Sequence, residues 1–195
     1  AQLTREEKVS LCRGNSTFYV NAIPRVGLKE ELSFSDGPHN VRPEVKRDSW
    51  GHVGGTADFS TSLPPLTALS ATWDPALAAL FGDTLGAEAR DRRKDVILGP
   101  GLNIMRTPLN GRNFEYMGED PFLASAMVVP LVRAIQAQDV AACVKHYAAN
   151  NQELNRLGVD VEMDERTLQE IYLPAFRAAV VDGGALVVMG AYNKF

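Results

Sequence analysis

Short apolar segments alternate with polar stretches along the whole chain. The segment at 32–35 (LSFS) alternates apolar and polar residues, as a strand with one buried face does. The segments at 96–98 (VIL), 140–144 (VAACV) and 185–189 (ALVVM) are continuous apolar runs, which are typical of short buried strands. A further short strand is expected at 66–70 (LTALS). These patterns predict five strands.

Helical patterns fill the intervals between these segments. The sequence TREE at 4–7 has the form of a capping box and predicts a helix over about residues 5–13, with Val9 and either Leu11 or Cys12 turned inward. An acidic residue followed by a proline or a second acid starts each later helical pattern. We expect these three helices over the ranges 74–93, 120–138 and 164–184.

The order of strand, polar loop and helix predicts an α/β fold with parallel strands joined by right-handed crossovers. The residues at 41–63 are expected to form a long irregular loop. If the sheet closes into a β/α barrel, the loops that follow the strands converge at one mouth. Five strands cannot close an eight-stranded barrel, so the sheet is either open or completed by further chain.

Composition narrows the classes of protein. Hydrophobic residues make up 45% of the 195 residues and charged residues 23%, which is ordinary for a soluble globular domain. A net charge of −4 without a basic cluster argues against a nucleic-acid partner. The longest apolar runs fall far short of the roughly 20 residues of a membrane-spanning helix. Periplasmic, secreted and cytoplasmic locations all stay open.

The densest chemistry follows the apolar run at 140–144. Lys145 and His146 place two nitrogen groups at the end of a predicted strand, and amide side chains and Arg156 follow them. Such a set suits a ligand rich in hydroxyl groups. The histidines and cysteines show no metal-ligand spacing, and GPG at 99–101 lacks the third glycine of a phosphate loop. No metal site and no cofactor are therefore expected.

Two other polar stretches have simple structural interpretations. Asp36 lies in SDGP, which by itself indicates a turn. Arg112 is followed by acids at Glu115, Glu119 and Asp120, and these acids are expected to brace a long loop. Neither stretch alone indicates a function.

Taken together, the polar stretches resemble a known family. The segments FSDGPHNVR (34–42), GPGLNIMRTPLNGRNFEYMGEDP (99–121), CVKHYAANNQELNR (143–156) and MGAYNKF (189–195) are similar, in order and spacing, to the N-terminal barrel domain of glycoside hydrolase family 3. The resemblance extends over essentially the whole chain and is strongest to the β-glucosidase branch.

This resemblance implies a (β/α)8 barrel of the TIM type. The chain, 1–195, would supply the N-terminal part of that barrel domain, about the first five β/α units. The remainder of the barrel and a second α/β domain would come from elsewhere in the same enzyme. The oligomeric state stays open, a homo-oligomer included.

The resemblance also implies a set of substrate-binding residues. In the family, the matching positions bind the non-reducing sugar in the −1 subsite. Here they are Asp36, Arg112, Lys145, His146, Arg156, Met189 and Tyr192.

The implied activity is retaining hydrolysis of terminal non-reducing β-D-glucosyl residues from β-glucosides and cello-oligosaccharides, without metal or cofactor. The nucleophilic aspartate of the family lies in a Ser-Asp-Trp-like motif beyond MGAYN, and the acid/base glutamate comes from the second domain. Neither has a match in these 195 residues, so no catalytic residue is assigned. The isolated chain is expected to be inactive.

Other activities stay open at this point. YAANN at 147–151 replaces the Gly-His-Gly-Asp-type sequence of the N-acetylhexosaminidase branch, which favours a glucosidase or xylosidase. A β-xylosidase or another exo-β-glycosidase of the same family is the first alternative. A non-catalytic sugar-binding module is the second.

Overall fold

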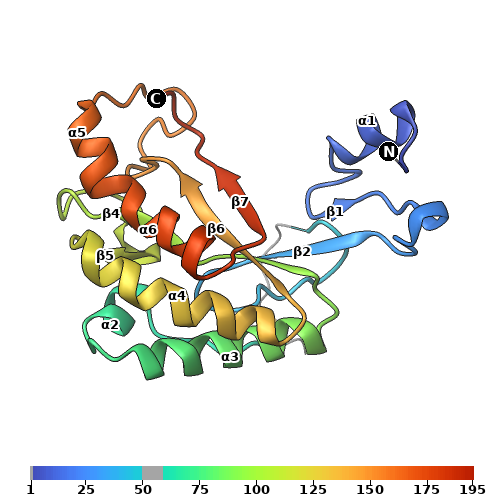
Figure 1. Ribbon diagram of the computed structural model, residues 1–195, viewed down its shortest axis with the longest axis horizontal. Coiled ribbons are helices and arrows are strands. Elements are labelled where there is room, and N and C mark those ends of the chain that lie inside the picture. Colours follow the sequence, from blue (N-terminus) through green and yellow to red (C-terminus); the bar gives the residue numbers. More distant parts are fainter. Residues whose placement is uncertain (1, 50–58) are drawn as a thin grey trace.

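A computed structural model describes residues 2–49 and 59–195 of the chain (Figure 1). Its main body is a parallel sheet with helices along one side. The strands are β1 (Tyr19–Val20), β2 (Leu32–Asp36), β3 (Val96–Leu98), β4 (Gly101–Ile104), β5 (Tyr116–Gly118), β6 (Ala141–Tyr147) and β7 (Val187–Gly190). The α-helices are α1 (Arg5–Leu11), α2 (Leu66–Ser70), α3 (Pro75–Asp91), α4 (Pro121–Ala137), α5 (Glu165–Thr167) and α6 (Leu173–Arg177).

Strand β6 is the centre of the sheet. It pairs in parallel with β3 near its start, with β4 near its end and with β7 along its length. Strand β2 pairs in parallel with β3, and β5 with β4, whereas β1 is antiparallel to β2. Parallel pairing points the carboxyl ends of β2, β6 and β7 the same way, so the loops after them can meet.

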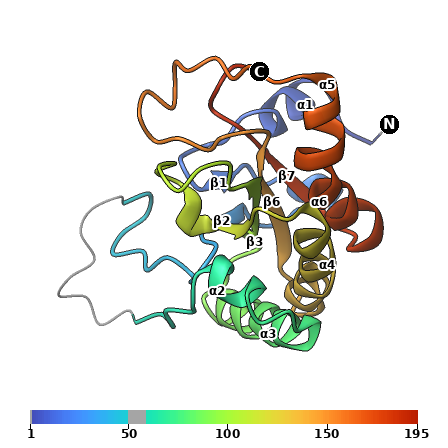
Figure 2. The same ribbon diagram turned by 90° about the vertical axis from the view of Figure 1, so that its left-hand side faces the viewer.

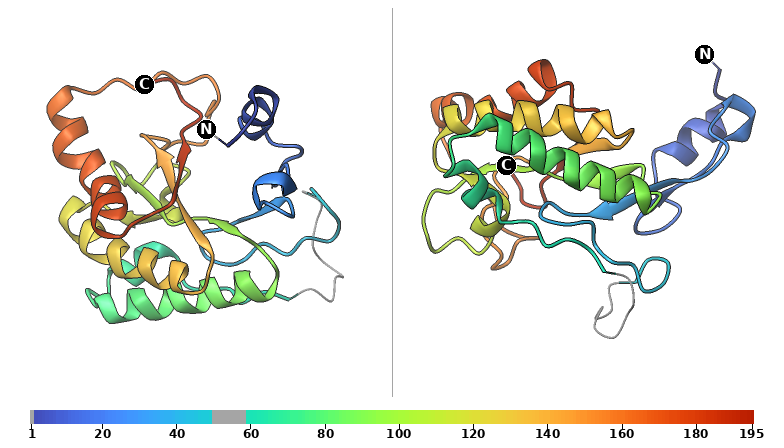
Figure 3. Two further views of the ribbon diagram at one scale, coloured as in Figure 1. Left: turned by 45° about the vertical axis from the view of Figure 1, so that its right-hand side comes forward. Right: turned by 90° about the horizontal axis from the view of Figure 1, so that it is seen from below.

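The helices α3, α4 and α6 lie side by side over the sheet (Figures 1 and 2). Asp74 and Asp120 accept hydrogen bonds from the first-turn N–H groups of α3 and α4, where both helices were predicted to begin. The main core forms between these helices and strands β3, β4 and β6. Figure 3 shows the same layer of helices from below. The α/β class predicted from the sequence is confirmed.

Three strands, β1, β4 and β5, were missed, and one predicted strand is a helix. Residues 66–70 form α2, which starts after Pro65 and buries Leu66 and Leu69 one turn apart. This short apolar run fits both the period of a helix and that of a strand, and only the face that is buried in the fold distinguishes a helix from a strand here. Strands β4 and β5 carry polar side chains such as Asn103 that bond inside the protein, so their sequence lacks a strand pattern.

The N-terminal segment differs from the prediction in its packing. The capping box at Thr4 and Glu7 is present, but α1 buries none of its residues, and Val9 is 61% exposed. The prediction that Val9 and either Leu11 or Cys12 pack inward is wrong. Figure 1 shows the reason, because α1 stands apart from the sheet and its helices.

The last helical stretch is longer than α5 and α6 alone. The π-helical segment Leu168–Tyr172 joins α5 to α6, and a second one, Ala178–Asp182, continues α6, so that one helical run covers most of the range predicted from the sequence. The loop predicted at 41–63 is irregular over its described residues, 41–49 and 59–63. Its middle, 50–58, lies outside the described residues.

Candidate functional site

A cavity of about 590 Å³ opens at the carboxyl ends of the strands. Most of its wall comes from the ends of β2, β3, β6 and β7 and from the segments that follow β2, β4, β6 and β7, as the α/β fold requires. Thr17 and Phe18, just before β1, complete it. All seven residues predicted to bind substrate line this one cavity: Asp36, Arg112, Lys145, His146, Arg156, Met189 and Tyr192.

Lys145 is the most central cation of the cavity. It lies within β6, one residue beyond the apolar run, and its side chain is 4% exposed. Its Nζ lies 3.4 Å from Asp36 Oδ1, donates to the carbonyl of Gly37 at 3.2 Å, and lies 3.6 Å from Glu115 Oε2. The ammonium group is thus held between two carboxylates, and both of them line the cavity.

Arg112 is held by two glutamates. Its Nη2 lies 2.5 Å from Glu115 Oε1, and its Nη1 donates to Glu153 Oε2 at 2.7 Å. Burial lowers the pKa of Arg112, but Glu115 and Glu153 more than offset this and raise it above its ordinary value. The guanidinium group therefore stays charged although it is largely buried.

Glu115 is the buried partner shared by both cations. Burial raises the pKa of its carboxyl group above the ordinary value, against the opposing effect of Lys145 and Arg112. The expected role of Glu115 in bracing the loop is confirmed by its ion pair with Arg112. Asp120 accepts hydrogen bonds from the first N–H groups of α4, so it stabilises a helix start and does not reach the cavity.

His146 lies beside Lys145 and is 1% exposed. Its Nδ1 lies 3.0 Å from the hydroxyl oxygen of Tyr116, and its Nε2 lies 3.5 Å from Nη2 of Arg112. Burial, together with the charges of Lys145, Arg112 and Arg156, lowers the pKa of His146 to about 2. The imidazole is therefore neutral at ordinary pH and cannot serve as a positively charged donor.

The loop after β6 closes one side of the cavity through Glu153. This carboxylate accepts from Arg112 at 2.7 Å and from Arg156 at 2.6 Å, so it joins two cavity cations. The guanidinium carbon of Arg156 lies 5.2 Å from the ring centroid of Tyr192, a cation–π contact that links this loop to the segment after β7.

Sequence reasoning missed several wall residues. Glu153 received no role in the sequence-based prediction, although its position three residues before Arg156 is a recognisable ion-pair spacing. Phe18 and Phe114 also line the cavity, and nothing in their sequence context points to it. Apolar faces beside charged hydrogen-bonding groups are suited to a ring that carries hydroxyl groups.

Charges on the described part of the wall balance. The cations are Arg112, Lys145 and Arg156, and the carboxylates are Asp36, Glu115 and Glu153. A neutral polar ligand suits this arrangement better than a strongly charged one.

Within residues 2–49 and 59–195, no group of three or more His, Cys, Asp or Glu side chains could hold a metal ion. No helix of the described chain is both long and apolar enough to span a membrane.

Comparison with known proteins gives a consistent match. Residues 30–195 fit the family described as the glycosyl hydrolase family 3 N-terminal domain. Beta-glucosidase BoGH3A of Bacteroides ovatus is 56% identical over 193 residues, which are 99% of this chain and 26% of that protein. Thermostable beta-glucosidase B of Acetivibrio thermocellus is 41% identical, over 99% of this chain and 25% of its own length.

Solved structures agree with the sequence matches. Beta-glucosidase 3B from Thermotoga neapolitana, in complex with glucose, superimposes with a TM-score of 0.88 at 39% identity. The match covers 99% of this chain and 28% of that one, so the chain spans about a quarter of the length of its relatives. These matches, together with the α/β fold and the cavity, show that the chain belongs to glycoside hydrolase family 3, in its N-terminal domain.

Proposed function

We propose that this chain forms most of the −1 sugar subsite of a retaining β-glucosidase that releases terminal non-reducing β-D-glucosyl residues. The observation that carries the proposal is the convergence of Asp36, Arg112, Lys145, His146, Arg156, Met189 and Tyr192 on one cavity. Charged donors and acceptors form shorter and stronger hydrogen bonds to hydroxyl groups than neutral ones do.

The ion pairs of the cavity hold its side chains in fixed positions before a ligand binds. Asp36, Lys145, Glu115 and Arg112 form a connected set, so none of the four side chains can turn away without breaking a partly buried contact. A preorganised set of this kind loses little conformational entropy when a ligand binds, and it can tighten on an oxocarbenium-like transition state.

A retaining glycosidase also needs a nucleophilic carboxylate and a carboxylic acid roughly 5–5.5 Å apart. Glu115 is engaged by two buried cations, and Asp36 contacts Lys145. Both are therefore proposed to bind and position rather than to react. The two reacting carboxylates, the remainder of the barrel and a second α/β domain are proposed to belong to protein beyond these residues.

A β-glucoside is favoured over other exo-glycosides by the relatives. The relative at 56% identity is named a beta-glucosidase, whereas the exo-alpha-(1->6)-L-arabinopyranosidase of Bifidobacterium longum is 38% identical over 98% of this chain. A panel of aryl β-D-glucoside, β-D-xyloside and α-L-arabinopyranoside tests this preference. We expect the full-length protein that carries this chain to have its highest kcat/KM on the glucoside.

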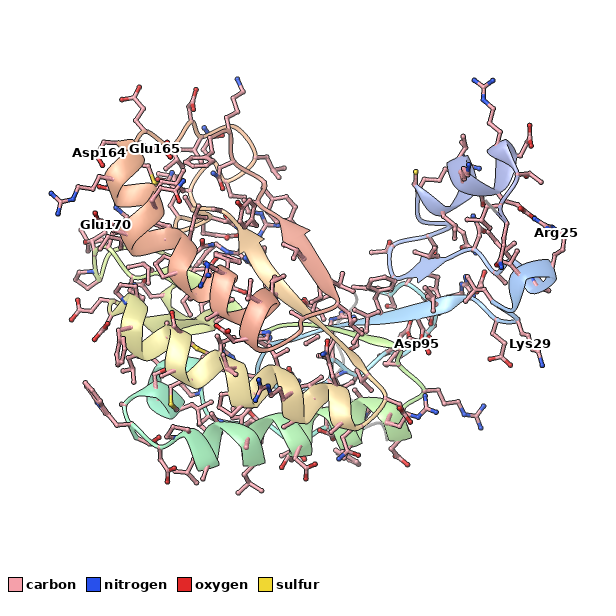
Figure 4. The ribbon with its side chains drawn as sticks, viewed as in Figure 1. Arg25, Lys29, Asp95, Asp164, Glu165 and Glu170 are labelled. Atoms are coloured by element: carbon pink, nitrogen blue, oxygen red, sulfur yellow. The ribbon has the colours of Figure 1, made fainter. Side chains whose placement is uncertain are left out.

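Substitutions in the cavity test the subsite itself. Arg112→Ala and Lys145→Ala should each lower kcat/KM on the glucoside by about 10- to 150-fold, since a hydrogen bond to a charged group contributes about 1.5–3 kcal/mol. Lys29→Ala is the matched control, because Lys29 is exposed on the N-terminal segment, far from β6 and β7 (Figure 4). An unchanged kcat/KM in both cavity variants contradicts the assignment.

The isolated 195-residue polypeptide tests whether the reacting groups lie in this chain, and the full-length protein separates the enzyme proposal from the sugar-binding module. We expect it to show no glucoside turnover, because no carboxylate of its cavity is proposed to react. Turnover by the isolated polypeptide that Asp36→Ala abolishes would show that the reacting groups lie within this chain. A full-length protein without turnover that still binds glucose would favour the module.

A further inference from the structure

Tyr116 is a fully buried residue whose hydroxyl group has three polar atoms within hydrogen-bond distance and also interacts with the guanidinium group of Arg112. The hydroxyl donates to the carbonyl oxygen of Asn150, it lies 3.2 Å from Nδ2 of Asn103, and it lies 3.0 Å from Nδ1 of His146. The sequence indicated no role for this tyrosine, and Tyr116 is not among the residues that line the cavity. Its contacts nevertheless determine the state of a residue that does.

The orientation of the Asn103 amide follows from two backbone groups. Asn103 Oδ1 accepts from the N–H of Ala149 at 2.8 Å, and a backbone N–H can only donate. Asn103 Nδ2 is therefore on the other side, where it donates to the carbonyl of His146 at 2.9 Å and to the hydroxyl oxygen of Tyr116. Asn103 thus uses one lone pair of the Tyr116 oxygen.

The hydroxyl of Tyr116 can then serve His146 in one way only. A phenolic hydroxyl has one proton to donate, and the Asn150 carbonyl, which can only accept, uses that proton. Asn103 Nδ2 and the guanidinium group of Arg112 also face this oxygen and can only donate to it, so the hydroxyl has no second proton to offer Nδ1 of His146. Nδ1 must therefore carry a proton and donate it to Tyr116.

The other ring nitrogen has the opposite requirement. Nε2 of His146 lies 3.5 Å from Nη2 of Arg112, which can only donate. A proton on Nε2 would point at the N–H groups of Arg112 and repel them, whereas a lone pair on Nε2 can accept a hydrogen bond from them. The low pKa of His146, about 2, removes the doubly protonated form at ordinary pH.

We propose that Tyr116 is a positioning residue that fixes the neutral tautomer of His146 with its proton on Nδ1, so that the single lone pair of Nε2 can accept from a ligand hydroxyl in place of the long, 3.5 Å contact with Arg112. The tautomer follows from the contacts of this chain alone. The role of Nε2 toward a sugar rests on the proposed function.

The cavity then offers both halves of a hydroxyl recognition pair. Lys145 and Arg112 can only donate, whereas Nε2 of His146 can only accept, and all three line the same cavity. A hydroxyl group can satisfy a donor and an acceptor at once, but an ether oxygen or a fluorine cannot donate. His146 would therefore select for hydroxyl groups and against substituents that accept only.

Nitrogen-15 NMR of the full-length protein, labelled at histidine, tests the tautomer directly. The two His146 resonances are identified by their loss in His146→Gln. We expect Nδ1 to resonate as a protonated nitrogen and Nε2 as an unprotonated one at neutral pH. A protonated Nε2 in the unsubstituted protein would overturn the proposal, whatever the variants do.

Tyr116→Phe keeps the buried ring and removes only the hydroxyl. We expect the single state of His146 to be lost, with a population protonated at Nε2. Tyr172→Phe is the matched control, because Tyr172 is also fully buried and its hydroxyl donates to Asn151 Oδ1 at 2.9 Å, away from His146. The control should leave the His146 pair unchanged. An unchanged pair in Tyr116→Phe would contradict the positioning role.

Titration with glucose tests the acceptor role separately. Bound glucose should shift the Nε2 resonance and leave Nδ1 protonated. Glucose that binds without moving Nε2 would overturn the acceptor role. Failure of glucose to bind would count against the proposed function and the acceptor role together, whereas the ligand-free spectra decide the tautomer.

Discussion

Lys145 and His146 are neighbours in the chain, yet the first side chain is charged and the second is neutral. The ammonium of Lys145 has Asp36 and Glu115 within 3.6 Å, so its charge is compensated although it is buried. His146 has cations around it and no carboxylate among its ring contacts in the described chain. The sequence marks both as polar groups at a strand end, but only the surroundings decide which one is charged.

The depressed pKa of His146 predicts a pH dependence of stability. The pKa is about 2 when the protein is folded and about 6.5 when it is unfolded, so the unfolded state binds more protons between these values. His146 therefore contributes stability above pH 6.5 that is lost as the pH falls toward 2. The expected slope from this one group is about 1.4 kcal/mol per pH unit.

Urea unfolding at a series of pH values measures this slope, with His146→Gln as the comparison. The variant should lose stability less steeply below pH 6.5, because glutamine does not titrate. Parallel curves for the two proteins would show that His146 is protonated equally in both states. A constant offset between the curves carries no weight, since only their slopes report the titration.

At the scale of elements, α3 and α4 show how close packing depends on particular glycines. Gly82 faces the backbone of α4, and a Cβ atom there would lie 2.4 Å from the carbonyl oxygen of Leu131. Gly86 has a similar contact, 2.9 Å from the carbonyl oxygen of Ile135. The two helices can pack at this distance only because both positions lack a side chain.

We expect Gly82→Ala to destabilise the protein by about 1–3 kcal/mol, because the added methyl group forces the two helices apart. Helix propensity alone predicts the opposite sign, since alanine is favoured over glycine by about 1 kcal/mol in a helix. Thermal unfolding of Gly82→Ala measures the sign of the stability change and so decides between the two expectations. Ala87→Gly, at an exposed position of the same helix, reports the propensity contribution by itself.

Prediction of the elements succeeded where the apolar spacing repeats over several turns or a helix cap is present, and it failed for short segments. Helices α3 and α4 begin at Asp-Pro pairs and carry several turns of apolar spacing. Residues 66–70 are too short to distinguish a helix from a strand. Strand β5 is three residues long and owes its position to pairing with β4, which no local pattern encodes.

At the scale of the whole molecule, the chain exposes an apolar groove of about 480 Å³ between α6 and β7. Phe176, Val180, Val181 and Val188 line it, and Val181 is 63% exposed. Apolar surface of this extent favours association with other apolar surface.

The isolated polypeptide is accordingly expected to self-associate, and Val181→Lys should weaken that association by at least about tenfold, since burying one valine contributes about 1.5 kcal/mol or more. Sedimentation velocity over a range of concentrations measures it. Leu154→Lys adds the same charge at an exposed position on the loop after β6 and is the matched control. Equal effects of both substitutions would attribute the change to net charge.

The local sequence was sufficient for the α/β class and for the order of most elements, because apolar period and helix caps act between near neighbours. The family motifs added the seven cavity residues. Tertiary packing alone decided that Glu115 holds two cations, that Glu153 joins Arg112 to Arg156, and that His146 is neutral. Charge and protonation depend on distances in space, and those distances exist only once β4, β6 and the loops after them are assembled.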